Sequence, residues 1–253
     1  MEWPVILAVI GVGIIAGFIN TVAGSGSLLT LPLLMFLGLP ANVANGTNRI
    51  GILLHNIVGV ATFRQHKVLD FKEGLRIGIP ATVGSLVGAQ VAINLNEAIM
   101  TKTIGGLLVI MFFIIILNPD RWIKSREGHE PLRRWLQIII FFVIGIYGGF
   151  IQAGVGFFLL TGLVLGVGID LVKANAIKVF IVLLYTPFAL LVFIYNRQVD
   201  YKLGLILAAG NMIGAFLGAK YAVRVGARAV SYFVLVALAL SALQLLGVFE
   251  LIF

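Results

Sequence analysis

Long runs of apolar residues, separated by short polar connectors, recur along the whole chain. Runs such as 104–117 and 138–146 are continuously apolar and lack the alternation of a half-buried strand. A helix of about 20 apolar residues crosses the roughly 30 Å hydrocarbon core of a bilayer. The pattern predicts an all-α integral membrane protein and argues against a β-barrel, whose strands alternate polar and apolar residues.

These runs predict ten helical segments. They are residues 4–23, 27–38, 43–63, 72–93, 97–117, 134–153, 157–168, 171–194, 202–223 and 228–249. Segments 27–38 and 157–168 are too short to span a bilayer upright, and the sequence leaves open whether they cross it or re-enter.

Composition agrees with a membrane protein and narrows the chemistry. Of the 253 residues 60% are hydrophobic and 11% are charged, whereas soluble domains carry about 25% charged residues. The net charge of +8 is spread over the short connectors and forms no single basic face, so we expect no nucleic acid partner. The chain has no cysteine, which excludes disulfides and thiolate chemistry, and no motif calls for a metal or other cofactor.

The two halves of the chain repeat each other. Eight residues of the first half are identical to the residues 130 positions later in the chain. They are Asp70, Lys72, Gly74, Leu75, Gly84, Gly88, Ala89 and Ala92. Such co-registered glycines and charges argue for duplication, because shared hydrophobicity alone would match only Leu and Val. We predict a first repeat at 1–117, a hydrophilic cytoplasmic linker at 118–133 and a second repeat at 134–253.

The distribution of cations predicts how the repeats are oriented. Five crossings in each half place most of the 18 Lys and Arg on one side, which the positive-inside rule identifies as cytoplasmic. If each short segment instead forms one crossing with the segment before it, the repeats are parallel and Lys and Arg are divided more evenly between the two sides. We therefore predict a helical bundle of two inverted-topology repeats with interrupted or short helices, and both termini outside.

A glycine-rich break interrupts the first helix of each half. The first copy reads Gly17-Phe-Ile-Asn-Thr-Val-Ala-Gly24-Ser-Gly-Ser27, and the second runs from Gly149 through Gln152 to Gly156. A break inside a membrane frees backbone N–H groups, which suits a cavity and an anion at the start of the following helix. The candidate ligand groups are Asn20, Thr21, Gly24, Ser25, Gly26, Ser27, Gln152, Gly154 and Gly156. The alternative is that these glycines only permit close helix packing.

The third helix of each half carries a cation within an apolar stretch. Thr47, Asn48 and Arg49 lie in the first half, and Asn175 and Lys178 in the second. No intramembrane Asp or Glu is evident to pair with Arg49 or Lys178, so a charged substrate is a candidate partner. The alternative is that both cations snorkel to the membrane interface.

Other polar residues have more ordinary explanations. Asp70 and Asp200 each precede a helix and read as N-caps. His55, which aligns with Tyr185, is expected to be a hydrogen-bonded packing residue, with proton coupling as the alternative. The Gly84-xxx-Gly88 pattern and its copy from Gly214 favour helix packing.

The glycine signature resembles that of the sulfite exporter TauE/SafE family. The likeness rests on Gly13-xxx-Gly17-xx-Asn20-xxx-Gly24-x-Gly26-xxxxx-Pro32 and on the degenerate second copy near Gly145-xxx-Gly149. The Ala44-xx-Thr47-Asn48 and Ala174-xxx-Lys178 elements extend it over nearly the whole chain. The resemblance implies anion transport in a bacterial-type plasma membrane, with sulfite, sulfonates or related sulfur oxyanions as substrates. Ser25 replaces a glycine common in the family, and Phe157-Phe158 replaces small residues.

We therefore expect a multi-pass secondary transporter, an exporter of a small anion and not an enzyme. In this interpretation the break residues donate hydrogen bonds, Asn48 and Gln152 orient the substrate, and Arg49 or Lys178 balances its charge. A channel-like anion pathway, an intramembrane serine protease using Ser25 and His55, and a purely structural subunit are the alternatives. The expected partners are the substrate and the bilayer, with a homo-oligomer left open.

Overall fold

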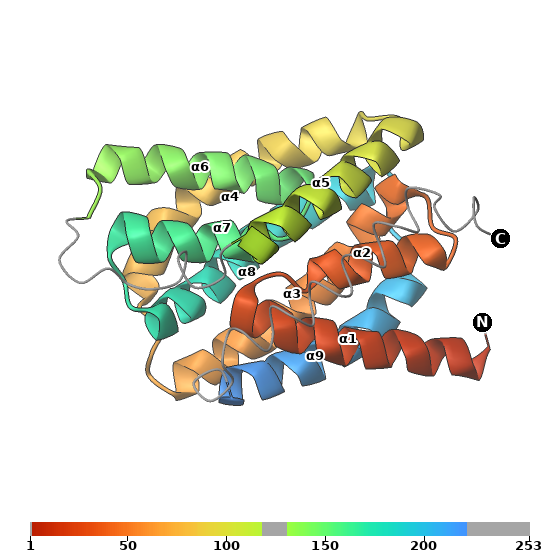
Figure 1. Cartoon of the computed structure of the whole chain (residues 1–253), viewed down its shortest axis with the longest axis horizontal. Coiled ribbons are helices and arrows are strands. Elements are labelled where there is room, and N and C mark those ends of the chain that lie inside the picture. Colours follow the sequence, from red (N-terminus) through yellow and green to blue (C-terminus); the bar gives the residue numbers. More distant parts are fainter. Residues whose placement is uncertain (1, 118–130, 222–253) are drawn as a thin grey trace.

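The computed structural model describes residues 2–117 and 131–221, and every regular element within them is a helix (Figure 1). The elements are α1 (Trp3–Ala23), α2 (Ser27–Phe36), α3 (Ala41–Gln65), α4 (Phe71–Ile93), α5 (Glu97–Leu117), α6 (Arg134–Phe150), α7 (Val155–Thr161), the π-helical turn η1 (Gly162–Val167), α8 (Leu171–Tyr195) and α9 (Tyr201–Tyr221). The predicted tenth segment at 228–249 and linker residues 118–130 lie outside the described residues.

Several of these helices are suited to the bilayer, which confirms the predicted all-α membrane fold. Among the described residues, α1, α4, α5, α8 and α9 are long and apolar enough to cross a membrane. Helix α3 is also long, at 25 residues, but it carries buried polar side chains that face the protein interior. The α2 helix has 10 residues and is therefore about 15 Å long, half the thickness of the hydrocarbon core.

Both short segments turn back instead of crossing. The η1 turn ends beside the start of α6, because Gln137 near that start donates to the carbonyl of Gly166 at 3.3 Å. In Figure 1, α2 likewise returns toward the end of the bundle at which α1 begins. The break in the second half comes earlier than predicted: α6 ends at Phe150, and α7 starts at Val155 after Gly154 adopts a φ of 72°.

Glycines allow two pairs of helices to pack closely. A Cβ atom on Gly13 would lie 3.2 Å from the Cα of Gly210, and one on Gly214 would overlap the carbonyl of Ile14, so α1 runs parallel to α9. On α4, a Cβ on Gly84 or Gly88 would overlap carbonyls of α6 in the same way. The glycine patterns of the fourth helix in each half therefore serve helix packing, as predicted.

The first helices of the two halves begin at opposite ends of the bundle. Helix α4 starts beside the start of α6, where Arg76 donates to Gln137 at 2.7 Å, and it ends beside the start of α9, where Gln198 donates to the carbonyl of Ile93 at 3.3 Å. Since α1 is parallel to α9, α1 and α6 run in opposite directions, as Figure 1 shows. This orientation agrees with inverted repeats, whereas the repeat boundaries stay a prediction.

The connections before α4 and α9 have the same backbone structure. Lys67 and Arg197, which are 130 positions apart, both adopt left-handed φ angles, of 56° and 57°. Asp70 then accepts a hydrogen bond from the Glu73 amide at 3.1 Å, and Asp200 accepts one from the Leu203 amide at 2.9 Å. The predicted N-caps are confirmed.

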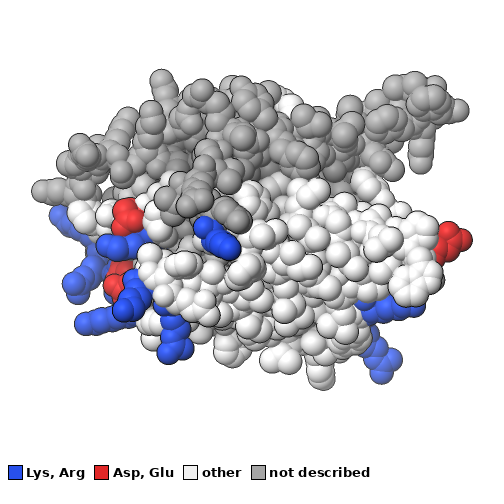
Figure 2. All heavy atoms as spheres, turned by 90° about the horizontal axis from the view of Figure 1, so that it is seen from below, with Lys and Arg blue, Asp and Glu red and all other residues white. Residues whose placement is uncertain are grey.

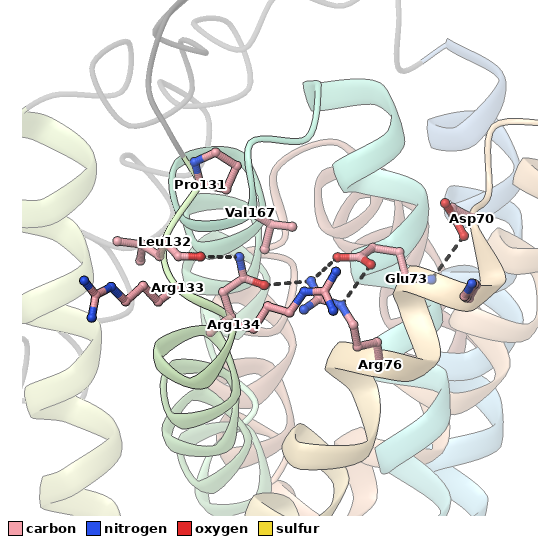
Figure 3. A pocket seen from close by; sticks show the side chains of 10 residues that line it. Asp70, Glu73, Arg76, Pro131, Leu132, Arg133, Arg134 and Val167 are labelled. Atoms are coloured by element: carbon pink, nitrogen blue, oxygen red, sulfur yellow. Dashed lines mark hydrogen bonds and ion pairs between the residues drawn. The ribbon is translucent and has the colours of Figure 1, made fainter.

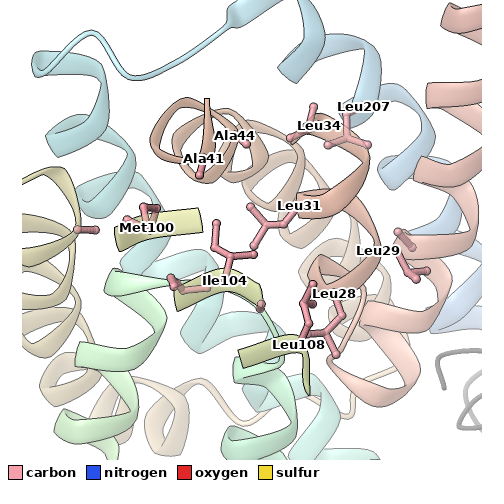
Figure 4. Close-up of a cluster of buried hydrophobic side chains, with 14 of the residues drawn as sticks. Leu28, Leu29, Leu31, Leu34, Ala41, Ala44, Met100, Ile104, Leu108 and Leu207 are labelled. Carbon is pink, nitrogen blue, oxygen red and sulfur yellow. The ribbon is translucent and has the colours of Figure 1, made fainter. Parts of the chain in front are cut away.

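The largest hydrophobic cluster surrounds α2. Its leucines pack against α5, with further contacts from α3 and α9 (Figure 4). The fully buried members from these elements include Leu28, Leu31, Leu34, Ala41, Ala44, Met100, Ile104, Leu108 and Leu207. This packing holds the short helix in the interior, next to the break that precedes it.

Charged side chains occupy the two ends of the bundle and leave an apolar band between them. Figure 2 shows most Lys and Arg at the end where α6 begins, and fewer at the opposite end. We expect the more basic end to be cytoplasmic, from the positive-inside rule.

Candidate functional site

The two helix breaks meet at the centre of the bundle. Gly24 ends α1 with a φ of 74°, and the amide of Gly156 donates to its carbonyl at 3.1 Å. A Cβ on Gly24 would lie 2.5 Å from the Cα of Gly156, and a Cβ on Gly156 would equally overlap the backbone of Gly24. Only glycine at both positions permits this contact, so the breaks predicted from each half form one structure.

The first break borders a small polar pocket between α1, α2, α3 and α9. It is lined by Ala16, Gly17, Asn20, Gly26, Ser27, Thr30, Ile52, His55 and Asn211. Its volume of ≈ 10 Å³ has room for about one water molecule. The pocket is therefore closed in this conformation, and a sulfur oxyanion would need it to widen.

The polar atoms around this pocket are only partly satisfied by the protein. The Thr30 hydroxyl donates to Oδ1 of Asn48 at 2.7 Å, and Nδ2 of Asn48 is buried without a partner among the described residues. Oδ1 of Asn211 is also buried without a partner there. In the His55 ring, Nε2 lies 3.4 Å from the Thr21 hydroxyl, and Nδ1 lies 3.4 Å from the backbone carbonyl oxygen of Asn211. Unpaired buried groups are costly, which makes this pocket suited to a polar ligand.

Lys178 of α8 caps the broken α1 helix. Its ammonium donates to the carbonyls of Asn20 at 3.0 Å and Thr21 at 2.9 Å, within the last turn of α1. It also donates to Oδ1 of Asn175 at 2.8 Å, whose amide reaches the Val22 carbonyl at 3.4 Å. The Asn20 carbonyl also accepts from the Gly24 amide at 2.9 Å, so Lys178 adds a second donor there. A cation at a helix C-terminus is favoured by the helix dipole and can satisfy carbonyls at the helix end.

Arg49 of α3 does the same for the broken α6 helix. Its guanidinium donates to the carbonyls of Gly148 at 3.2 Å and Gly149 at 2.6 Å, in the last turn of α6. It also lies over the Phe193 ring, 4.6 Å from the ring centroid. Each half thus sends a cation from its third helix to the first helix of the other half.

This arrangement excludes the alternative that Arg49 and Lys178 extend to the membrane interface. Arg49 is 0% exposed and Lys178 is 3% exposed, so neither reaches the membrane interface. Backbone carbonyls partner both cations, while no Asp or Glu among the described residues is buried. Nε of Arg49 has no partner within the described part of the chain. Their role in balancing substrate charge stays a prediction.

The second break is packed with larger side chains. Nε2 of Gln152 donates to the Tyr185 hydroxyl at 2.7 Å, and a Cβ on Gly154 would lie 2.7 Å from the Met111 methyl group. Phe158 packs edge-on against both Tyr147 and Phe157. The Phe157-Phe158 pair thus lies in the aromatic packing beside the second break.

Three of the predicted site residues, Thr47, Asn175 and Ser25, do not line the pocket. The Thr47 hydroxyl accepts from the Asp200 amide at 2.8 Å and so fixes the start of α9. Asn175 bridges Lys178 to α1 and does not line the pocket. Ser25 is buried but is not among the pocket-lining residues.

Thr30 and Asn211 line the pocket and were not among the predicted site residues. Asn211 is an isolated amide in an apolar helix, and its counterpart 130 positions earlier is Ala81. That loss of repeat symmetry is a signal by which the sequence could have identified it. The protease interpretation gains no support, because the His55 ring contacts Thr21 and Asn211 and no hydrogen bond joins it to Ser25 among the described contacts.

Comparison with known proteins identifies one family and several similar proteins named as probable membrane transporters. The sequence profile described as "Sulfite exporter TauE/SafE" matches residues 9–245. A probable membrane transporter protein of Sinorhizobium sp, ORF9, is 27% identical over 229 residues, covering 90% of this chain and 87% of that protein. The probable membrane transporter protein YfcA of Escherichia coli K12 is 28% identical over 254 residues, covering 97% and 91%. A probable membrane transporter protein of Haemophilus influenzae is 27% identical over 214 residues, covering 83% and 82%. No solved structure matches the chain.

Proposed function

Since the chain belongs to the sulfite exporter TauE/SafE family, we propose that it is a secondary transporter that exports a small anion across the plasma membrane. The candidate substrates are sulfite and other sulfur oxyanions or organosulfonates. The relatives are named as membrane transporters without a substrate, so the substrate class comes from the family description alone.

The observation that carries this proposal is the polar pocket at the first helix break. Ser27 begins α2 beside the pocket, and among the described backbone contacts Leu28 is the first α2 amide that donates to a carbonyl. The earlier amides, the Ser27 hydroxyl and Nδ2 of Asn48 are donors suited to an anion at a helix N-terminus. The Lys178 ammonium donates to the carbonyl of the pocket-lining Asn20 and adds positive potential.

Transport requires the pocket to open to each side in turn. Because Gly24 and Gly156 are in contact and the capping cations cross between the halves, movement of one half displaces the broken helix of the other. An inside-negative potential favours anion exit by about 2.3 kcal/mol per charge per 100 mV. Export therefore needs no intramembrane carboxylate.

The first experiment measures flux in proteoliposomes. Sulfite, thiosulfate, sulfate and a small sulfonate are tested for uptake and efflux under an imposed membrane potential. Saturable, potential-sensitive flux of one anion is the expected result. Flux that does not saturate would favour a channel-like pathway, and no flux of any of them would overturn the proposed substrate class.

The pocket itself is tested by Ser27→Ala. Loss of one hydrogen bond to a charged ligand costs about 1.5–3 kcal/mol, so we expect KM to rise roughly tenfold to a hundredfold. The matched control is Ser85→Ala, because Ser85 is equally buried but donates to the Thr82 carbonyl of its own helix, away from the pocket. Equal KM values for the two variants would place the substrate elsewhere.

A further inference from the structure

A second, larger cavity lies at the end of the bundle where α4 and α6 begin. Its volume is ≈ 1050 Å³, and its lining includes Lys72, Glu73, Arg76, Arg133, Arg134 and Gln137 (Figure 3). It lies outside the pocket at the helix breaks, with which it shares no lining residue. Transport as proposed above does not use it.

The acidic residues of this cavity are already engaged. Asp70 accepts from the Glu73 amide as the N-cap of α4, and the Glu73 carboxylate pairs with Arg76. Neither Lys72 nor Arg134 has a carboxylate partner among the described ion pairs. Helix α6 also begins here, with no side-chain cap and no acidic residue in its first turn. The described lining of the cavity therefore carries more positive than negative charge, increased by the positive end of a helix dipole.

Part of the cavity wall is held in place before any ligand binds. Arg76 donates to Oε1 of Gln137 at 2.7 Å and to Glu73. The buried Gln137 side chain in turn donates to the carbonyls of Leu132 at 2.9 Å and Gly166 at 3.3 Å. Figure 3 shows Arg134 directed toward Arg76 and Glu73, while Arg133 points away. The Arg76 guanidinium, fixed in this way, favours a ligand with several oxygen acceptors, such as a phosphate group.

The surfaces next to the cavity are apolar and face outward. Phe71 and Leu75 on α4 are 41% and 43% exposed, and Trp135 and Ile139 on α6 are 55% and 50% exposed. Helix α4 is long and apolar enough to cross a membrane, so lipid is the expected neighbour of Phe71 and Leu75. A tryptophan near a helix end is typical of the membrane interface.

We propose that this cavity binds the phosphate group of an anionic phospholipid, whose acyl chains lie along the exposed faces of α4 and α6. Lys72 and Arg134 supply the excess positive charge of the described lining, and Arg76 donates from its fixed position. A soluble phosphate would satisfy the same donors but would leave the exposed apolar residues without a role. The lipid is therefore the favoured source of the phosphate.

The test measures lipid retention by the full chain with native mass spectrometry. The protein is released from mixed micelles that contain equal amounts of phosphatidylglycerol and phosphatidylcholine. We expect preferential retention of phosphatidylglycerol, and a loss of about fivefold for each charge removed in Lys72→Gln/Arg134→Gln, since one cation near a membrane surface contributes about 1 kcal/mol. Arg76 is left intact because its network holds α4 to α6.

The matched control is Lys202→Gln/Arg197→Gln, which removes the same two residue types at the opposite end of the bundle. This control should retain phosphatidylglycerol as the wild type does. Equal retention by both double variants, or no preference of the wild type for phosphatidylglycerol, would overturn the proposal. A third arm adds inorganic phosphate: displacement of phosphatidylglycerol at low millimolar phosphate would show that a soluble anion is the preferred occupant and would overturn the lipid assignment.

Discussion

Gly24, which ends α1, and Gly154, which precedes α7, adopt nearly the same φ angles, 74° and 72°, yet their surroundings differ. Beside the first break lie Asn20, Ser27, His55 and Asn211, which leave a small polar space. Beside the second, Met111 closes on Gly154 and Tyr185 takes the place that His55 has in the first half. Polar atoms without a partner occur at both breaks, since Oε1 of Gln152 is buried unpaired at the second. The comparison teaches that the two copies share a scaffold, whereas the polar pocket borders the first break.

The largest expected effect comes from removing the contact that both breaks share. In Gly24→Ala, the new Cβ meets the backbone of Gly156 and the residue keeps a left-handed φ. Left-handed alanine costs about 1–2 kcal/mol and overpacking adds about 1–3 kcal/mol, so we expect a loss of about 2–5 kcal/mol of stability, with little folded protein recovered. The measurement is the yield of monodisperse protein and its unfolding temperature in detergent.

Gly38→Ala is the matched control for that substitution. Gly38 has a φ of 90° but nothing within 4 Å of its Cβ position, so only the backbone strain applies. If Gly24→Ala proves as stable as Gly38→Ala, the contact between the breaks is not required.

The next largest effect tests whether the capping cations are equivalent. Lys178→Met leaves the Thr21 carbonyl without its donor, while the Asn20 carbonyl keeps the Gly24 amide; Arg49→Met removes the donors to two carbonyls of α6. Each unsatisfied buried acceptor costs about 1–3 kcal/mol, so we expect each variant to lose about that much for every carbonyl left unpaired. Unfolding in detergent measures this loss.

Lys173→Met provides the comparison for the lysine. Lys173 is exposed on α8 and pairs with Asp170 at 3.5 Å, a surface ion pair worth about 0–1 kcal/mol. A Lys178→Met protein as stable as Lys173→Met would mean that Lys178 does not support the α1 break. A large loss for Lys178→Met and none for Arg49→Met would show that the two halves are not equivalent.

Exchanging the aligned side chains sharpens the contrast between the breaks. His55→Tyr puts a larger ring into a space of ≈ 10 Å³, so we expect at least a tenfold fall in flux and an overpacking cost of about 1–3 kcal/mol. Tyr185→His loses the hydrogen bond from Gln152, worth about 1 kcal/mol, and should leave KM unchanged. Proteoliposome flux and thermal unfolding are measured on both variants. A KM change of equal size in Tyr185→His would show that substrate contacts the second break too.

The smallest effect concerns a feature that the halves share. Asp70→Ala and Asp200→Ala each remove an N-cap hydrogen bond to an amide three residues on, and each should cost about 1 kcal/mol. Unfolding temperatures of the two variants should therefore fall by similar amounts. A cost confined to one of them would mean that its helix end is held by other contacts.

The sequence alone predicted most of the local structure. The end of α1 at Ala23, the bounds of α5 and the caps at Asp70 and Asp200 follow from apolar run length and from turn chemistry. These signals act between residues close in the chain, so they can be read without knowing the fold. The duplication likewise predicted helix packing at the later glycines.

Only the tertiary structure decided what the central polar residues contact. Arg49 is 99 residues from Gly148, and Lys178 is 158 residues from Asn20, so no local pattern could pair them. The sequence showed two buried cations without carboxylates, and a substrate was a reasonable partner; the packing supplied helix-end carbonyls instead. It also placed Thr30 and Asn211 at the first break and closed the second, because the size of a space depends on side chains that converge from four helices.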